Sequence, residues 1–330
     1  MNSVQDIYFN ADYGKLYEKA ENGKAVVWEY EGKEGKVSHQ FIVREIPIQY
    51  GDDLWYDIVT PYGYGGPLIC EISEGYTREA LVAAFERAFG EYCSENRIVS
   101  EFVRFHPIIK NADDFSDMYN AKCIRKTLGT NLEAYDDPVA SEFSKSCRKD
   151  VRRALDKGIS WRITLNPDSI DDFKKIYFST MDRNNASDYY YFDDEYFADC
   201  LKYFKKNIIF AEAIYEDKII AGGLYFVYNG IIHIHLSGTL TEFLPLSPTY
   251  VLNYAITVWG KENGYRLIHR GGGTSNSEDN SLYLFKKKFS RNTEFDFYVG
   301  KKIWNKDIYK KLCEIMGNNA ESDFFPAYRK

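Results

Sequence analysis

The most constraining part of this sequence is a run of three strand-like segments between residues 208 and 239. The segments IIFAEAIY, IIAGGLYFVY and IIHIHLSG are separated by Glu216-Asp217 and by Asn229-Gly230. Asn-Gly strongly favours a two-residue hairpin turn, because both residues tolerate a positive φ. The pattern therefore predicts an antiparallel meander of three strands.

Helical patterns flank this meander on both sides. Two helices are expected before it, over residues 170–184 and 193–206. After it, Ser247 and Pro248 fit the N-cap and first position of a helix that stops at Gly264. A short apolar strand, RLIHR, then leads into three consecutive glycines. This order predicts an α+β fold with a mixed central sheet flanked by helices.

The first half of the chain has the same order in outline: strands, a helix over 77–96, a strand, a short helix and another strand. A length of 330 residues favours two domains. We place an N-terminal domain at 1–140 and a C-terminal domain at 141–304. The helix expected within 305–330 is assigned to the surface of the first domain.

Composition excludes several classes of function. The net charge of −7 argues against a non-specific nucleic-acid binder, and no DNA partner is expected. No apolar run is long enough to span a bilayer, and the N-terminus lacks the charge and apolar pattern of a signal peptide. Six scattered cysteines without a CxxC pair fit reduced thiols in the cytoplasm.

Five separated segments carry a family resemblance: DIVTPYGYGGP (57–67), FSKSCRKDVRRALDKG (143–158), IIAGGLYFVYNGIIHIHLSGT (219–239), LSPTYVLNYAITVWGKENGYRLIHRGGGTS (246–275) and SLYLFKKKF (281–289). In this order they resemble the Fem-type (FemAB-like) aminoacyltransferases of peptidoglycan cross-bridges, members of the GNAT superfamily of N-acetyltransferases. The resemblance implies two tandem GNAT-like domains facing a shared cleft.

The resemblance also implies an activity. It is the transfer of an acyl or aminoacyl group to a primary amine of a peptidoglycan-precursor-like acceptor, as a small molecule or linked to a nucleotide or lipid. The donor would be an acyl-CoA or an aminoacyl-tRNA, with no tightly bound cofactor. The alternative is a non-catalytic GNAT-fold module that binds an envelope sugar, a peptide or a protein partner.

One departure concerns the donor. Many acetyl-CoA users carry Arg/Gln-x-x-Gly-x-Gly/Ala before the helix that binds the pyrophosphate, and this chain has LTEFLPLSPTYVL there, without glycine. A helix N-terminus still favours anions. Ser247 and Thr249 are therefore the candidate donor-binding residues.

The catalytic candidates are one lysine and two histidines. Lys286 matches a lysine that the family keeps at the cleft, where an ammonium could neutralise a phosphate or an oxyanion; the alternative is a solvated charge. His233 and His235 share one face of a strand, and His269 lies on the strand expected beside it. One of these rings could act as a general base or proton shuttle, or they could be polar core residues. No metal site is predicted, because no nearby cysteine or carboxylate completes a ligand set.

Substrate contacts are predicted in four places, and three of them have a structural alternative. The Tyr-Gly corner could touch the acceptor or be a tight turn. The basic helix at 143–158 could bind a phosphate-rich ligand such as a tRNA acceptor stem, or be solvated. A bulge at the end of the third strand could aim an N–H at the donor carbonyl, or be a turn. With the triple-glycine loop, the predicted residues are Tyr62, Tyr64, Gly65, Gly66, Arg148, Arg152, Ser237, Gly238, Thr239, Gly272, Gly273 and Thr274.

Overall fold

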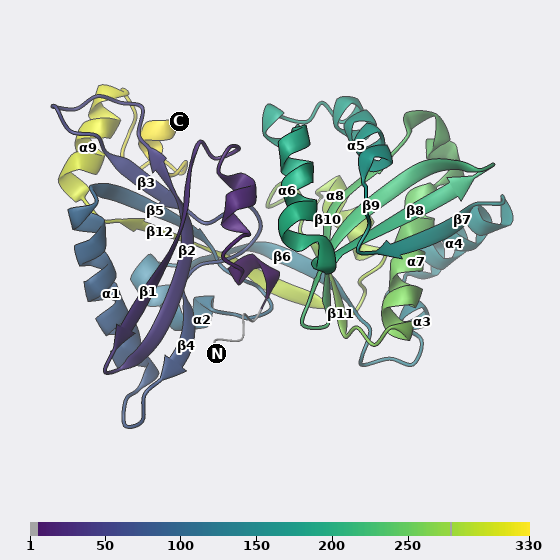
Figure 1. Ribbon diagram of the computed structural model, residues 1–330, viewed down its shortest axis with the longest axis horizontal. Coiled ribbons are helices and arrows are strands. Elements are labelled where there is room, and N and C mark those ends of the chain that lie inside the picture. Colours follow the sequence, from purple (N-terminus) through teal and green to yellow (C-terminus); the bar gives the residue numbers. More distant parts are fainter. Residues whose placement is uncertain (1–5, 278) are drawn as a thin grey trace. The chain divides into compact units, whose positions relative to one another are not determined.

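The computed structural model describes residues 6–277 and 279–330 and forms two compact units (Figure 1). Unit 1 holds the chain up to Ile124 together with Asp296–Lys330, and unit 2 is Arg125–Phe295. The chain passes between the units inside two strands, β6 (Lys122–Asn131) and β12 (Glu294–Ile303). The observed divisions therefore fall within strands, whereas the sequence placed them at residues 140 and 304.

The sheet of unit 2 contains the predicted meander, in the strand order β6-β11-β10-β9-β8-β7. Its further strands are β7 (Ser160–Leu165), β8 (Ile208–Tyr215), β9 (Lys218–Tyr228), β10 (Ile231–Thr239) and β11 (Leu267–Gly271). Both meander turns have a positive φ at their two central residues, Glu216-Asp217 and Asn229-Gly230. β11 runs parallel to β10, and β6 pairs antiparallel with β11. The hairpin prediction is confirmed.

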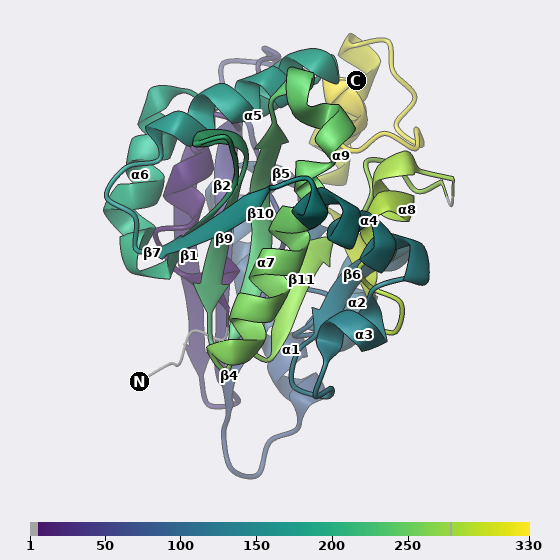
Figure 2. The ribbon, with the colours of Figure 1, turned by 90° about the vertical axis from the view of Figure 1, so that its right-hand side faces the viewer.

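Helices cover both faces of this sheet. They are α3 (Pro138–Glu142), α4 (Lys145–Asp156), α5 (Asp171–Arg183), α6 (Asp194–Phe204), α7 (Pro248–Glu262) and α8 (Ser281–Lys287), with a 3₁₀ turn, η5 (Thr241–Leu246), before α7. Val251 and Ile256 of α7 pack against the apolar face of the meander, which includes Ile232 of β10. α4 in turn packs on α7 (Figure 2). α5 and α6 lie over the opposite face, where Phe173 approaches Gly222.

Two local expectations in unit 2 need correction. Ser247 does not cap α7 with its side chain; its backbone is left-handed, with a φ of 61°, and the helix begins directly at Pro248. The strand β7 and the helix α3 are absent from the sequence prediction. β7 is a six-residue strand that, among the residues the structure describes, pairs with β8 alone. The formation of this strand depends on its pairing with β8 rather than on the hydrophobic pattern of its own residues.

Unit 1 has a sheet in the order β1-β2-β3-β5-β12, with β4 paired to β2. Its strands and helices are β1 (Gly23–Gly32), β2 (Gly35–Glu45), β3 (Tyr56–Val59), β4 (Leu68–Ile72), α1 (Arg78–Glu95), β5 (Ile98–Arg104), α2 (Ala112–Tyr119) and α9 (Lys306–Ile315). Phe85 and Phe89 of α1 pack on Phe41 of β2 to form its core. α9 belongs to this unit and contacts β5.

The two units repeat one topology and exchange one strand. Each unit has three successive antiparallel strands, then a helix, then a strand that runs parallel to the third of these strands, and then a short helix. In unit 1 these elements are β1, β2, β3, α1, β5 and α2, and in unit 2 they are β8, β9, β10, α7, β11 and α8. The next strand along the chain then pairs in the other unit: β6 pairs with β11, and β12 pairs with β5. The structure is thus a duplicated mixed α+β architecture in which each half contributes the last strand of the other.

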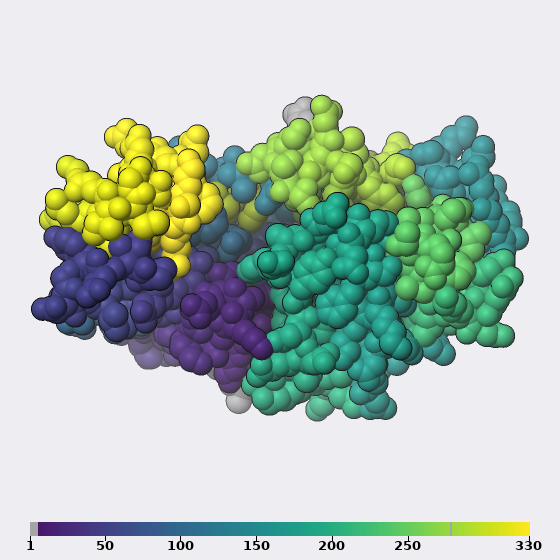
Figure 3. Space-filling view, turned by 90° about the horizontal axis from the view of Figure 1, so that it is seen from above, coloured from purple at the N-terminus to yellow at the C-terminus, as the bar shows by residue number. Residues whose placement is uncertain are grey.

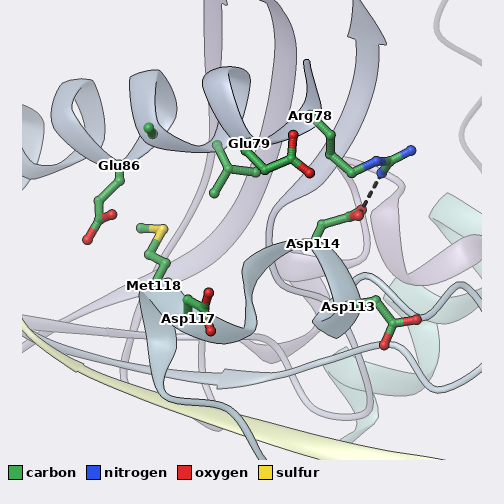
Figure 4. A pocket seen from close by; sticks show the side chains of 9 residues that line it. Arg78, Glu79, Glu86, Asp113, Asp114, Asp117 and Met118 are labelled. Carbon is green, nitrogen blue, oxygen red and sulfur yellow. Dashed lines mark hydrogen bonds and ion pairs between the residues drawn. The ribbon is translucent and has the colours of Figure 1, made fainter.

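A groove in unit 1 lies between α1 and α2 and is lined by carboxylates (Figure 4). The Arg78 guanidinium pairs with Asp114 at 2.6 Å, and Lys302 pairs with Glu86 at 2.6 Å. The acidic lining residues are Glu79, Glu86, Asp113, Asp114 and Asp117. Because these residues repel phosphates, this groove does not suit an acyl donor that carries them.

Candidate active site

The parallel strands β10 and β11 begin as neighbours and then separate. Their register runs from Ile231 opposite Leu267 to His233 opposite His269 and stops there. β10 continues to Thr239 paired with β9 alone, through a bulge between Ile234 and Leu236. Among the described residues, positions 234–239 of β10 have no strand partner on the β11 side. An extended ligand can therefore hydrogen-bond to this unpaired strand edge.

The equivalent strands of unit 1 stay joined. β3 pairs with β5 as far as Val59 opposite Phe102. Beyond the strand, the Thr60 N–H donates to the Phe102 carbonyl at 3.1 Å, and Gly65 forms a bridge with Phe105. Of these two related strand pairs, only the one in unit 2 is open.

The triple glycine follows β11 at the end where the strands have separated. Gly271 has a positive φ of 67°. The carbonyl of Gly272 accepts from Lys286 Nζ at 2.8 Å, and the carbonyl of Gly273 accepts from Arg125 at 2.9 Å. A phosphate cradle presents backbone N–H groups. This loop instead directs two carbonyl oxygens at cations, so it positions lysine and arginine side chains.

Lys286 is placed by the short helix α8. The Asn280 side chain caps this helix by accepting from the Tyr283 N–H at 3.0 Å, and it also donates to Thr274 Oγ1 at 2.8 Å. Burial, followed by the nearby charges of Arg270 and Arg125, lowers the pKa of Lys286 from 10.5 to about 8. An ammonium with such a pKa can release and regain its proton near neutral pH.

Arg270 is a buried cation that the sequence reasoning did not single out. Its guanidinium donates to Thr130 Oγ1 at 2.8 Å, to Asn253 Oδ1, and to Thr257 Oγ1 at 3.2 Å. It also lies over the ring of Phe289, 5.3 Å from the centroid. All these partners are neutral, and burial lowers the Arg270 pKa to about 10. The positive field of Arg270 is therefore available to Lys286.

This architecture has known counterparts. Residues 141–279 match the family model described as an acetyltransferase (GNAT) domain. This segment therefore has the GNAT fold. It contains the meander, the separated strands and the triple glycine, and it ends just before α8. No curated protein matches the sequence significantly.

Solved structures share the fold over nearly the whole chain. FemX has a TM-score of 0.67 at 13% identity, covering 93% of this chain and 94% of its own. L-PGS from Bacillus licheniformis has a TM-score of 0.55 at 14% identity, covering 95% and 98%. The C-terminal domain of a putative lysylphosphatidylglycerol synthetase from Agrobacterium fabrum has a TM-score of 0.56 at 13% identity, covering 91% and 89%. The Fem-type GNAT resemblance in the sequence is confirmed at the level of fold.

The three histidines of unit 2 lie together, as their strand positions predict. His233 is fully buried, and its ring meets that of His269 edge-on at 5.5 Å. His235 is half-buried and shares a 2.5 Å hydrogen bond with the Tyr196 hydroxyl. Burial and then the charge of His233 lower the pKa of His235 to about 3. A ring with that pKa is a weak base at neutral pH, so it suits hydrogen bonding better than proton transfer.

The end of β10 packs closely under α5. A Cβ atom at Gly238 would lie 2.6 Å from the carbonyl oxygen of Ile176, which gives this glycine a packing reason. The Thr239 N–H donates to Thr180 Oγ1 at 2.8 Å, so it is not directed at a donor carbonyl. Thr239 Oγ1 also lies 2.9 Å from Thr249 Oγ1, while Ser237 is exposed. The predicted bulge exists, but it lies at residues 234–236.

Three cations of unit 2 form hydrogen bonds close to the start of α7. Lys157 donates to the Pro245 carbonyl at 3.1 Å, Lys288 to the Tyr250 hydroxyl at 2.9 Å, and Arg183 to the Thr239 carbonyl at 3.0 Å. The helix has no side-chain cap. This N-terminus can thus still attract an anion although the glycine loop is missing.

The remaining predicted residues lie on helix α4 and in the Tyr-Gly corner. Arg148 donates to the carbonyls of Ala140 and Phe143, at 2.8 and 2.5 Å, and thereby ties α3 to α4, whereas Arg152 is exposed. The Tyr-Gly corner belongs to unit 1. There Tyr64 is buried against the rings of Tyr8, His106 and Phe297.

Asn111 holds the same corner in place. Its side chain donates to the carbonyls of Gly65 and Pro67, at 2.8 and 2.9 Å. Gly66 has a φ of 87°, and a Cβ there would lie 2.8 Å from Val103. Tyr62 is half-buried, and its carbonyl accepts from the Tyr13 hydroxyl at 3.0 Å. Gly66 therefore has a backbone reason of its own.

Proposed function

We propose that unit 2 transfers an acyl or aminoacyl group from an ester or thioester donor to a primary amine. The observation that carries the proposal is the separation of β10 from β11 with Lys286 held at the open end. The donor arm lies along the unpaired edge of β10. Its carbonyl group reaches the region of the triple glycine and Lys286.

The chemistry is direct aminolysis. The acceptor nitrogen forms a bond to the donor carbonyl carbon, the carbonyl oxygen becomes an oxyanion, and the C–O or C–S bond then breaks. The Lys286 ammonium stabilises the oxyanion and donates a proton to the departing oxygen or sulfur. The amine must arrive uncharged, and its own proton leaves to solvent or to the regenerated lysine.

The donor carries phosphates, and the uncapped start of α7 is the proposed place for them. Lys157, Lys288 and Arg183 supply positive charge there, in addition to the predicted Ser247 and Thr249. GNAT domains generally use acyl-CoA. The fold similarity to a lysylphosphatidylglycerol synthetase favours an aminoacyl donor instead.

The acceptor is proposed to be a peptidoglycan-precursor-like amine of the cell envelope, in accord with the Fem-type fold. Tyr62, Tyr64, Gly65 and Gly66 remain predicted acceptor contacts. No helix within the described residues is long and apolar enough to cross a bilayer. A cytoplasmic location is part of the proposal.

The test is a panel of donors and acceptors read by mass spectrometry. Acetyl-CoA, longer acyl-CoA thioesters and charged tRNA are each incubated with nucleotide-linked and lipid-linked muropeptides. We expect an acceptor that gains the mass of one acyl group, and little gain with Lys286→Met. Acceptor binding by calorimetry without transfer from any donor would favour the non-catalytic module instead.

A further inference from the structure

Unit 2 carries its charges in an asymmetric way. Positive side chains lie along α4, which packs on α7. The first turns of α5 and α6, on the opposite face of the sheet, carry acidic residues instead: Asp171, Asp172, Asp194 and Glu195. The α4 side of unit 2 therefore carries more net positive charge than the side of α5 and α6.

Three cations of α4 form one exposed stripe. Lys145, Lys149 and Arg152 are spaced i, i+4 and i+7, which places them on one helix face. None of the three makes an ion pair or hydrogen bond with the residues that the structure describes. Arg148 and Arg153 differ, because Arg148 binds the Ala140 and Phe143 carbonyls and Arg153 pairs with Asp150 at 3.6 Å. The stripe is thus a set of unneutralised charges that face solvent.

Exposed leucines flank this stripe at both ends. At the start of α4, the Ser144 N–H donates to the Lys288 carbonyl at 2.8 Å, and one turn before Lys288 stands Leu284, which is 49% exposed. At the end of α4, Lys157 binds the Pro245 carbonyl, next to Leu244, which is 41% exposed. The segment that includes α8, coloured lime in Figure 3, lies at the surface of unit 2.

We propose that the α4 stripe and its flanking leucines dock unit 2 reversibly on an anionic phospholipid surface. Cations attract the lipid phosphates, while Leu244 and Leu284 enter the boundary between headgroups and acyl chains. The acidic first turns of α5 and α6 lie on the opposite face of the sheet, so the same charge distribution sets the orientation. This inference does not depend on the proposed transfer reaction.

A membrane explains the surface better than RNA does. RNA recognition favours arginine and aromatic planes that stack on bases. The stripe has one arginine, and the large exposed apolar residues at its two ends, Leu244 and Leu284, are aliphatic. Aliphatic side chains beside unpaired lysines are the composition of interfacial lipid-binding segments.

The experiment is cosedimentation of the full chain with vesicles of phosphatidylcholine alone or mixed with phosphatidylglycerol. We expect binding only to the mixed vesicles, weakened by high salt. Because each cation near such a surface contributes about fivefold, the triple change Lys145→Gln, Lys149→Gln, Arg152→Gln should weaken partitioning roughly 100-fold. The double change Leu244→Ser, Leu284→Ser should weaken it several-fold.

A matched triple change controls for net charge. Lys174→Gln, Lys202→Gln and Lys205→Gln remove the same charge from paired lysines elsewhere in unit 2 and should leave partitioning nearly unchanged. Circular dichroism confirms that each variant is folded. The proposal is wrong if mixed vesicles do not bind the chain, or if both triple variants lose binding equally. It is also wrong if the chain binds a short RNA duplex in preference to vesicles and the leucine variant behaves as wild type. The vesicles contain neither acyl donor nor amine acceptor, so these outcomes are separate from the transfer assay.

Discussion

Replacing Lys286 with methionine should stabilise the folded protein while it removes activity. The folded environment disfavours the ammonium, because burial and the neighbouring Arg270 and Arg125 lower its pKa from 10.5 to about 8. In the unfolded chain the same group titrates at its ordinary value. Below about pH 8 the lysine is charged in both states, so the full penalty of holding that charge in the folded protein applies.

The size of the effect follows from the pKa difference. Lowering a pKa from 10.5 to about 8, at about 1.4 kcal/mol for each pH unit, corresponds to about 3.5 kcal/mol. The side chain is partly exposed, and the variant loses the hydrogen bond to Gly272, so we discount this figure. Lys286→Met should therefore raise the free energy of unfolding by about 1–2 kcal/mol at neutral pH.

The assay is equilibrium urea unfolding followed by circular dichroism at several pH values. The folded state holds fewer protons than the unfolded state above about pH 8, so wild-type stability should rise relative to the variant between pH 8 and 10.5. Lys288→Met is the matched control on the same segment. Tyr250 raises the pKa of Lys288, so this change should lower stability instead. A Lys286→Met variant that is less stable than wild type at pH 7, or a stability difference that does not change with pH, would refute this reasoning.

Three further predictions test the candidate site and the fold that supports it. The transfer rate should fall above about pH 8 as Lys286 loses its proton, and a pH–rate profile of Lys286→Arg should show that limb moved to higher pH. Gly273→Ala should reduce transfer at least tenfold in a steady-state assay, because its Cβ would lie 2.4 Å from the Asn280 side chain that caps α8. Unchanged kinetics would show that the triple-glycine loop does not position Lys286 for transfer. Glu142→Gln should lower the free energy of unfolding by about 1–3 kcal/mol in urea titrations, because the buried carboxylate accepts from the Asn131 and Asn292 N–H groups. An unchanged free energy of unfolding would mean that the glutamine amide fully replaces the Glu142 carboxylate.

The meander was the part of the fold most readable from the sequence. Its turns need a positive φ at two adjacent positions, and Asn229-Gly230 is a residue pair that adopts this conformation readily. The sequence also placed His269 on a strand beside that of His233, and the structure pairs the two residues. Lys286 was identified by resemblance rather than by pattern, since three lysines in a row usually form a solvated surface.

The exchanged strands could not be foreseen in the same way. β6 and β12 look like ordinary strands, and their partners lie far away in the sequence. Likewise, nothing local reveals that Arg270 is buried, because its partners come from two other elements: Thr130 from β6, and Asn253 and Thr257 from α7. Tertiary pairing decides these features, and local propensity does not encode it.

The central claim is that an acyl donor binds along the open edge of β10 in unit 2. Amide hydrogen exchange, measured by mass spectrometry with and without a non-hydrolysable acyl-donor analogue, tests it directly. The account predicts new protection in residues 234–239 and in the loop at 271–274, with no change in the related segment 59–66 of unit 1. Protection confined to unit 1, or no protection in β10 at a saturating concentration of an analogue that binds, would contradict it.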